Sequence, residues 1–160
     1  METLVILFIV SIGLMAVLSL TRKSVQFQGV KNNLIIASYL SEEGLELMRN
    51  IRDTNIIMGN NYDAWDYLSS PEIGEHYYVV DYNLNAVSVE NEVSDPILRL
   101  DEHGFYGHDE TGDETIFRRL ITVRKEGTAS SSIESLVSWE DRGQSYNYKL
   151  ESVLYDVSVY

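Results

Sequence analysis

The sequence predicts an α+β fold, in which one long N-terminal helix packs on a C-terminal head built from an antiparallel β-sheet. The first part of the chain is almost wholly apolar, and the next part repeats apolar residues at helical spacing. The remainder alternates turn residues with short runs rich in Val, Ile, Tyr and Thr. The 160 residues suffice for one compact domain and an extension. We therefore divide the chain into a helix, residues 1–54, and a β-rich head, residues 55–160.

The segment from Thr3 to Thr21 contains no charged residue. As a helix its nineteen residues span about 28 Å, close to the hydrocarbon thickness of a bilayer. The other interpretations are a buried core helix and a cleaved secretory signal. A signal peptide has a basic region before its apolar stretch, whereas here Glu2 precedes the segment and Arg22 and Lys23 follow it. We therefore expect residues 1–21 to lie in a membrane or in the core of an assembly.

The orientation of this segment is ambiguous. Arg22 and Lys23 flank its C-terminal end, and the positive-inside rule would keep that end in the cytoplasm. The opposite orientation follows if a basic leader preceded Met1 and was removed. Both orientations stay open at the level of sequence.

Helical periodicity resumes after Thr21, without an intervening proline. One face carries small or apolar residues at intervals of three or four, which are Leu34, Ala37, Leu40, Gly44, Leu47 and Ile51. The flank opposite is polar and consists of Lys31, Asn32, Glu42, Glu43, Glu46, Arg49 and Asn50. The pattern predicts a nearly continuous helix from about residue 2 to Asp53, with residues 22–54 amphipathic.

Six runs in the head are predicted as strands. They are His76–Tyr82, Ala86–Glu90, Pro96–Leu100, Ile116–Lys125, Ile133–Glu140 and Tyr146–Tyr155. Turn signals separate several of them, at Asn83–Asn85, Glu126–Gly127 and Asp141–Gln144. The last two strands are expected to pair as a hairpin across Arg142 and Gly143.

Charge and cysteine content exclude several function classes. The formal net charge is −13, and residues 56–160 hold twenty of the 25 acidic residues but only seven of the 12 basic ones. An acidic head repels phosphate backbones, so nucleic acid is not an expected partner. Without cysteine the chain has no disulfide, thiolate zinc site or cysteine nucleophile.

Searches for catalytic and metal-binding patterns yield one weak candidate. His76, His103 and His108 form no zinc motif, and no nucleophile elbow or phosphate loop is present, so we expect no enzyme activity. The loop 101–114 is rich in carboxylates and glycine. Asp101, Asp109 and Asp113 there could bind calcium, although their spacing is not that of an EF-hand and a solvated loop is the plainer interpretation. No other cofactor is expected.

Aromatic residues are expected to serve packing. The set consists of Tyr62, Trp65, Tyr67, Tyr77, Tyr78 and Tyr82. We interpret it as core and subunit contact in preference to a ligand platform.

The order of these features resembles the type IV pilin family. Glu2 before the apolar run Leu4–Leu7 is similar to the family's acidic residue within an apolar helix. The stretches Tyr39–Asp53 and Val137–Gly143, with Leu154–Asp156, are similar to segments of pilin-like proteins of small-genome bacteria. The resemblance touches both ends of the chain. It implies a pilin-like fold.

The resemblance further implies a structural subunit, a major pilin, that forms a helical homopolymer. The chain would wait in the inner membrane, be processed and methylated through a prepilin peptidase, and enter an extracellular filament with the pilus assembly machinery. Such a filament serves adhesion, motility or uptake. Glu2 and Gly13 are the expected assembly residues, Gly13 as a helix-weakening position. The side chains expected to pack between helices are Leu4, Leu7, Phe8, Leu14 and Leu18.

Three features depart from the family pattern. In processed family members the acidic residue lies a few positions beyond the mature N-terminus, whereas here only Met1 precedes Glu2. The family often has a proline in its N-terminal helix, whereas the prolines here are Pro71 and Pro96. Many relatives tie the C-terminal region with a disulfide, which this chain cannot form. The C-terminal hairpin must therefore be stable without one.

Two alternatives are a minor pilin or pseudopilin and a membrane-tethered periplasmic or surface binding domain. A filament helix must pack on copies of itself, whereas an anchor need only be apolar. Gly13, Ala16, Gly29 and Ala37 permit close helix approach, which favours a filament.

Overall fold

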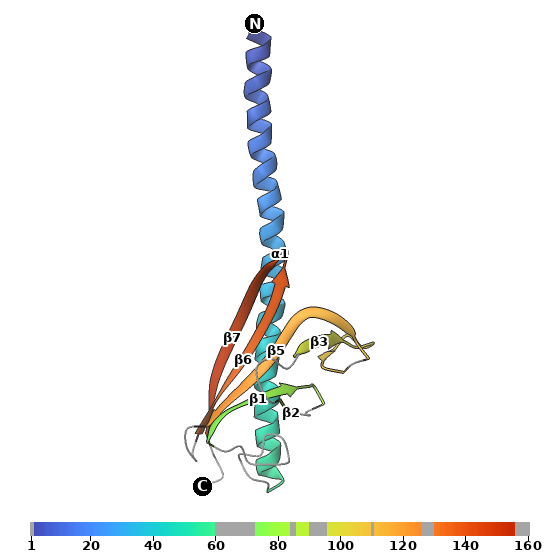
Figure 1. The fold of residues 1–160 in the computed structure, drawn as a ribbon, viewed down its shortest axis with the longest axis vertical. Helices are drawn as coiled ribbons and strands as arrows, with labels where there is room; N and C mark the ends of the chain where they lie inside the picture. Colours follow the sequence, from blue (N-terminus) through green and yellow to red (C-terminus); the bar gives the residue numbers. More distant parts are fainter. Residues whose placement is uncertain are drawn as a thin grey trace. The chain divides into compact units, whose positions relative to one another are not determined.

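The computed structural model describes residues 2–59, 73–83, 86–89, 96–109, 111–125 and 130–155 (Figure 1). The chain forms two compact units, Met1–Ile36 and Ala37–Tyr160. Its elements are α1 (Glu2–Ile57), β1 (Gly74–Val80), β2 (Ala86–Val89), β3 (Ile97–Leu100), β4 (Tyr106–Gly107), β5 (Asp113–Lys125), β6 (Ser130–Asp141) and β7 (Gln144–Tyr155). The α+β fold with a long apolar helix is as predicted.

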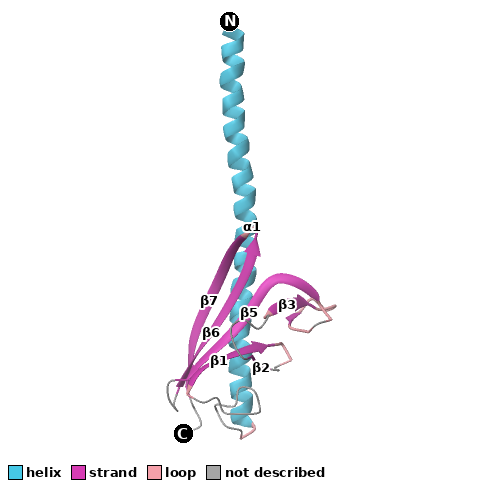
Figure 2. Ribbon diagram, in the orientation of Figure 1, coloured by secondary structure: helices cyan, strands magenta, loops and turns pink. Residues whose placement is uncertain are grey.

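The sheet is organised around the long strand β5. One edge of β5 pairs with β6, which in turn pairs with β7. The other edge pairs with β3 along residues 113–118 and with β1 along residues 121–125, and β2 and β4 extend these two branches. Every pairing among the described strands is antiparallel (Figure 2).

The C-terminal part of α1 packs on the face of the sheet that strand alternation makes apolar. Its buried residues are Ala37, Leu40, Ser41, Gly44, Leu45, Met48, Ile51 and Asn55. From the sheet, the same core receives Tyr78, Val80, Ile121, Val123, Ile133 and Leu154. In β1 and β6 these residues alternate with exposed or half-buried ones, as expected for a sheet covered on one face, whereas in the central strand β5 all of Arg119–Val123 are buried.

The predicted helix face needs two corrections. Leu34 is exposed and Leu47 is only half-buried, while Met48 is completely buried. At 3.6 residues per turn, the stripe through Ala37, Gly44 and Ile51 continues through Met48 and not through Leu47. The helix also extends to Ile57, past the predicted end at Asp53, and Gly59 follows with a φ of 74°.

The C-terminal hairpin is confirmed. Asp141 pairs with Gln144, and the two turn residues, Arg142 and Gly143, have φ values of 53° and 76°. Positive φ at both positions is the mark of a two-residue type I′ turn. Near the turn the rings of Trp139 and Tyr146 stack with centroids 5.5 Å apart.

An ionic ladder crosses four strands on the other face of the sheet. Arg124 on β5 contacts Glu75 on β1 at 3.4 Å and Glu134 on β6 at 3.0 Å. Lys149 on β7 contacts Glu134 at 3.4 Å and Glu151 at 2.7 Å. Together with the aromatic stack, these contacts hold β7 in a chain that has no disulfide. Because most of the ladder is partly exposed, its contribution to stability is modest.

Several strand boundaries also differ from prediction. β5 begins at Asp113 and not at Ile116, and β6 begins at Ser130 and not at Ile133. The short strand β4 was not predicted. The expected turns at Leu84–Asn85 and Glu126–Gly127 lie outside the described residues.

Candidate functional site

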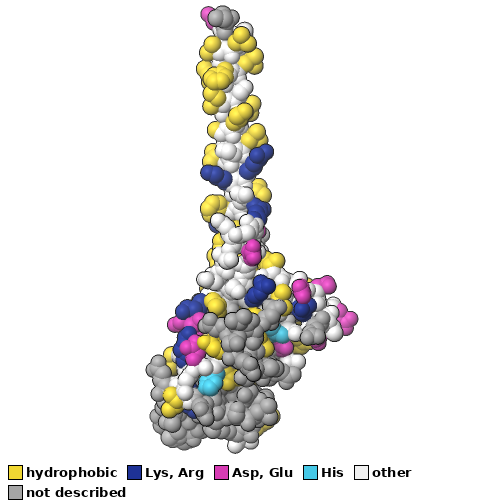
Figure 3. All heavy atoms as spheres, viewed as in Figure 1, with side chains coloured by type: hydrophobic (Ala, Val, Ile, Leu, Met, Phe, Trp, Pro, Cys, Tyr) yellow, Lys and Arg dark blue, Asp and Glu magenta, His cyan; other side chains and the backbone are white. Residues whose placement is uncertain are grey.

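The N-terminal part of α1 is apolar and fully exposed. By length and composition it could cross a membrane, and none of its most apolar stretch is buried within the chain. The five predicted packing side chains, Leu4, Leu7, Phe8, Leu14 and Leu18, are each 58–67% exposed. Figure 3 shows apolar side chains covering this part of the helix. Exposed surface of this extent must be covered by lipid or protein.

Glu2 and Gly13 lie on this exposed segment. Glu2 is in the first turn of α1, where a carboxylate is favourable to the helix dipole. A Cβ built on Gly13 would meet no atom within 4 Å, and the same is true of Gly29. Neither glycine is therefore required by packing within the described chain. Ala37 differs, because it is completely buried in the head and is not available to a neighbouring helix.

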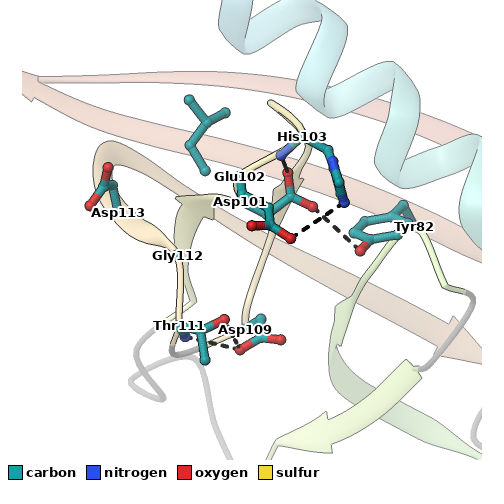
Figure 4. A pocket seen from close by; sticks show the side chains of 9 residues that line it. Tyr82, Asp101, Glu102, His103, Asp109, Thr111, Gly112 and Asp113 are labelled. Carbon is teal, nitrogen blue, oxygen red and sulfur yellow. Dashed lines mark hydrogen bonds and ion pairs between the residues drawn. The ribbon is translucent and has the colours of Figure 1, made fainter.

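The predicted calcium residues line a recess of about 560 Å³ at the edge of the sheet. Its lining residues are Tyr82, Leu100, Asp101, Glu102, His103, Asp109, Thr111, Gly112 and Asp113. Figure 4 shows these side chains, which come from the end of β1, from the segment after β3 and from the start of β5. The structure thus brings the three predicted aspartates to one surface.

Local hydrogen bonds already engage two of those aspartates. Asp101 Oδ1 accepts bonds from the backbone N–H groups of His103 and Phe105, both at 2.8 Å, and Asp101 Oδ2 accepts one from the Tyr82 hydroxyl at 3.4 Å. Asp109 Oδ1 accepts bonds from the N–H and the hydroxyl of Thr111, both at 2.9 Å. These are turn-stabilising contacts.

The same contacts account for the electrostatics of the recess. The backbone bond from Phe105 is the main cause that lowers the pKa of Asp101, and the bonds from Thr111 lower the pKa of Asp109. The negative charge of Asp101 raises the pKa of Tyr82. No group of three metal-binding side chains lies together among the described residues, which do not include Glu110. The calcium site therefore stays a prediction.

A buried polar cluster on the face of the sheet that α1 covers was not predicted. Arg119 is completely buried, and its guanidinium donates to the carbonyl oxygens of Val80 at 2.7 Å and Leu40 at 3.2 Å. The guanidinium also lies 3.4 Å from the carboxylate of Glu43. Burial lowers the pKa of Arg119, and the negative charge of Glu43 offsets part of this effect. The guanidinium thus ties α1, β1 and β5 together. Its signal in the sequence is an arginine at an inward position of the alternating strand Phe117–Val123.

Asp81 and His108 form the second part of this cluster. His108 contacts Asp81 Oδ1 through its ring Nδ1 at 2.6 Å and donates to it through its backbone N–H at 2.8 Å. Burial alone would raise the pKa of Asp81, but these bonds and the positive charge of Arg119 hold it below its usual value. The pair joins the end of β1 to the end of β4 and is a structural contact.

Comparison with known proteins identifies no relative. No family model matches the chain, and neither a curated protein nor a solved structure is significantly similar to it. The functional inference therefore depends on the exposed helix and the head themselves.

The predicted aromatic set has mixed outcomes. Tyr78 is in the core, Tyr77 is half-buried and Tyr82 is 51% exposed beside Phe105. Tyr62, Trp65 and Tyr67 lie outside the described residues. Aromatic packing that sequence reasoning missed runs from Tyr106 through Phe117 to Trp139, with centroids 6.4 Å and 6.1 Å apart.

Proposed function

We propose that this chain is the structural subunit of a surface filament of the type IV pilin kind. The observation that carries the proposal is the contrast along α1. From Ala37 onward one face of the helix is buried against the sheet, whereas the apolar residues before Leu20 have no partner in the described chain. A helix of this kind is suited to burial first in lipid and then among identical helices.

In this scheme the subunit resides in the inner membrane before assembly and in an extracellular filament afterwards. Its partners are copies of itself, together with a processing peptidase and an assembly machinery. Helix packing would use Leu4, Leu7, Phe8, Leu14 and Leu18. The acidic head would lie on the outside, where its charge favours solubility. Adhesion, motility and uptake are the roles that such a filament serves.

The direct test is electron microscopy of filaments sheared from the native cells, with mass spectrometry of their main protein band. We expect this chain to dominate the band. If it stays in the membrane fraction and no filament contains it, the proposal is wrong. A low abundance within filaments would instead indicate a minor pilin or pseudopilin.

Cysteine cross-linking provides a second test, because the chain has no native cysteine. Leu14→Cys is expected to give disulfide-linked dimers in sheared filaments, since neighbouring helices would pack closely there. Glu102→Cys, at an exposed turn of the head, is the matched control and should give fewer dimers. A permanent membrane anchor would show no such difference.

The second candidate is a membrane-tethered binding domain, and the recess near Asp101 favours it. The recess presents carboxylate oxygens, the Tyr82 hydroxyl and the His103 ring on one surface (Figure 4). Such a surface suits a cationic or hydrogen-bonding ligand. Failure of the filament test, together with retention in the membrane, would make this the leading account.

A further inference from the structure

Three basic side chains near the end of the apolar segment have no counter-ion among the residues that the structure describes. Arg22, Lys23 and Lys31 are exposed, and none makes an ion pair with any described residue. The other basic residues of the described chain make ion pairs or other polar contacts. Positive charge on the head is therefore paired locally, whereas positive charge on this part of α1 is not.

Two of these cations form a mixed face with an aromatic residue. Lys23, Phe27 and Lys31 follow one another at intervals of four residues, which places them along one side of the helix. Phe27 is 67% exposed. The face therefore presents an apolar ring with a positive charge about one turn away on either side.

A groove of complementary character lies on the head between α1 and β7. It has a volume of about 550 Å³ and is lined by Tyr39, Glu42, Glu43, Leu45, Glu46 and Leu150, together with Arg49. Tyr39 is 66% exposed and provides an apolar surface at its rim. The groove thus combines an apolar lining with three carboxylates.

The carboxylates of this groove differ in how far they are neutralised. Glu43 contacts the buried Arg119, and Glu46 contacts Arg49 at 3.2 Å in an exposed pair of little energetic value. Glu42 is exposed and makes no ion pair with a described residue. Glu42, and after it Glu46, are therefore the groups that an incoming cation would meet.

We propose that the Lys23–Phe27–Lys31 face of one copy docks into the α1–β7 groove of a second copy. The proposal rests on the filament function and specifies one of its contacts. Phe27 packs on Tyr39 and Leu150, and the lysines pair with Glu42 and Glu46. These cations and carboxylates, on average about seventeen residues apart in sequence, would then fix the stagger of neighbouring helices at roughly 25 Å of α-helix. Charge pairing of this kind sets register more than it sets affinity.

Charge reversal in the full chain tests this contact. Lys23→Glu with Lys31→Glu, and separately Glu42→Lys with Glu46→Lys, should each lower the yield of sheared filaments by at least about tenfold, since like charges would then meet. The four changes together should restore most of the yield. The control, Glu102→Lys with Glu140→Lys, reverses two exposed acids outside the groove and should leave the yield unchanged.

Mixed cross-linking tests the geometry directly. A Phe27→Cys chain and a size-tagged Tyr39→Cys chain, expressed together, should give a disulfide dimer of mixed size in filaments. Phe27→Cys with Glu102→Cys should not. Circular dichroism of each variant checks that the head remains folded.

Filaments that form normally with the reversed charges would overturn the docking contact and leave the filament function standing. A loss in the lysine variant that the four-fold variant does not restore would also overturn it, because the lysines would then contact another group, such as anionic lipid. If the unmodified chain forms no filaments, the filament function itself is wrong.

Discussion

A Cβ added to Gly44 on α1 would lie 2.6 Å from the Oγ of Ser135 on β6. It would also lie 2.8 Å from the Cδ1 of Ile121. One turn earlier, the hydroxyl of Ser41 donates to the carbonyl oxygen of Ser135 at 2.8 Å. The helix backbone at Gly44 is therefore in close contact with side chains of the sheet, and these side chains would have to shift to make room for a Cβ.

Gly44→Ala should destabilise the head by about 1–3 kcal/mol, because the overpacking outweighs the roughly 1 kcal/mol gain in helix propensity. Thermal unfolding of the full chain in detergent micelles, followed by circular dichroism, measures this change. Gly29→Ala is the matched control, since open space surrounds that position. Equal effects of the two substitutions would contradict the close contact.

Arg119→Ala should cost about 3–5 kcal/mol of unfolding free energy. The substitution leaves a cavity and removes the partner of two carbonyl oxygens and of Glu43. Arg99→Ala, which breaks a partly exposed pair with Glu114, should cost less than about 1 kcal/mol. Denaturant titrations of both variants measure their unfolding free energies. Similar decreases in the two variants would show that Arg119 does not anchor the helix to the sheet.

The Asp81–His108 contact should make stability depend on acid pH. The pKa of Asp81 is lower in the folded chain than in the unfolded chain, where it is near 3.8. The ionised carboxylate therefore stabilises the fold at pH values above 3.8, and this stabilisation is lost as the pH falls through the lowered pKa. Asp81→Asn should therefore lower the unfolding free energy by about 1–2 kcal/mol at pH 7 and have a smaller effect below about pH 3. Unfolding curves at several pH values measure the difference.

The control for this prediction is Glu102→Gln, which removes an exposed carboxylate elsewhere on the head. It should change stability little at any pH. If Asp81→Asn destabilises the chain equally at pH 7 and pH 3, the charge of Asp81 does not contribute to stability. The destabilisation would then come from altered packing alone.

The hairpin turn offers a stabilising substitution. Arg142 has a φ of 53°, a conformation that asparagine adopts more readily than arginine. Arg142→Asn gives the Asn-Gly pair preferred in type I′ turns and should raise stability by about 0.5–1 kcal/mol. Arg142→Val, with a β-branched residue, should lower it. If both substitutions raised the stability, or both lowered it, the result would contradict the turn geometry.

Glu2→Ala tests assembly without testing the head. A carboxylate at the centre of an apolar environment costs about 2.5–3.5 kcal/mol unless it is paired or neutralised, so Glu2 would need a partner once the helix is buried in the assembly. The variant should keep the head folded and yield few surface filaments, counted by electron microscopy. Glu102→Ala is the control for loss of an exposed acid, and normal piliation in Glu2→Ala would remove Glu2 from the assembly contacts.

Sequence reasoning succeeded where periodicity is strong and local. The long helix, the six predicted strands and the Arg142–Gly143 hairpin were all visible, because apolar spacing and turn residues act over a few positions. Strand ends such as Asp113 and the short strand β4 were missed, since pairing partners define them and residue type does not. The recess residues were proposed together because they are close in sequence.

From the sequence alone we could predict an apolar helix able to enter a membrane, an amphipathic continuation of that helix and an acidic β-rich head. Composition and period suffice for these features. Only the folded structure shows that Met48 takes the place of Leu47 in the core and that the buried Arg119 contacts Glu43. It also placed Leu150 of β7 beside Glu42 in one groove. Such contacts join residues about eighty or more positions apart, and local patterns carry no information about which distant strand a side chain will meet.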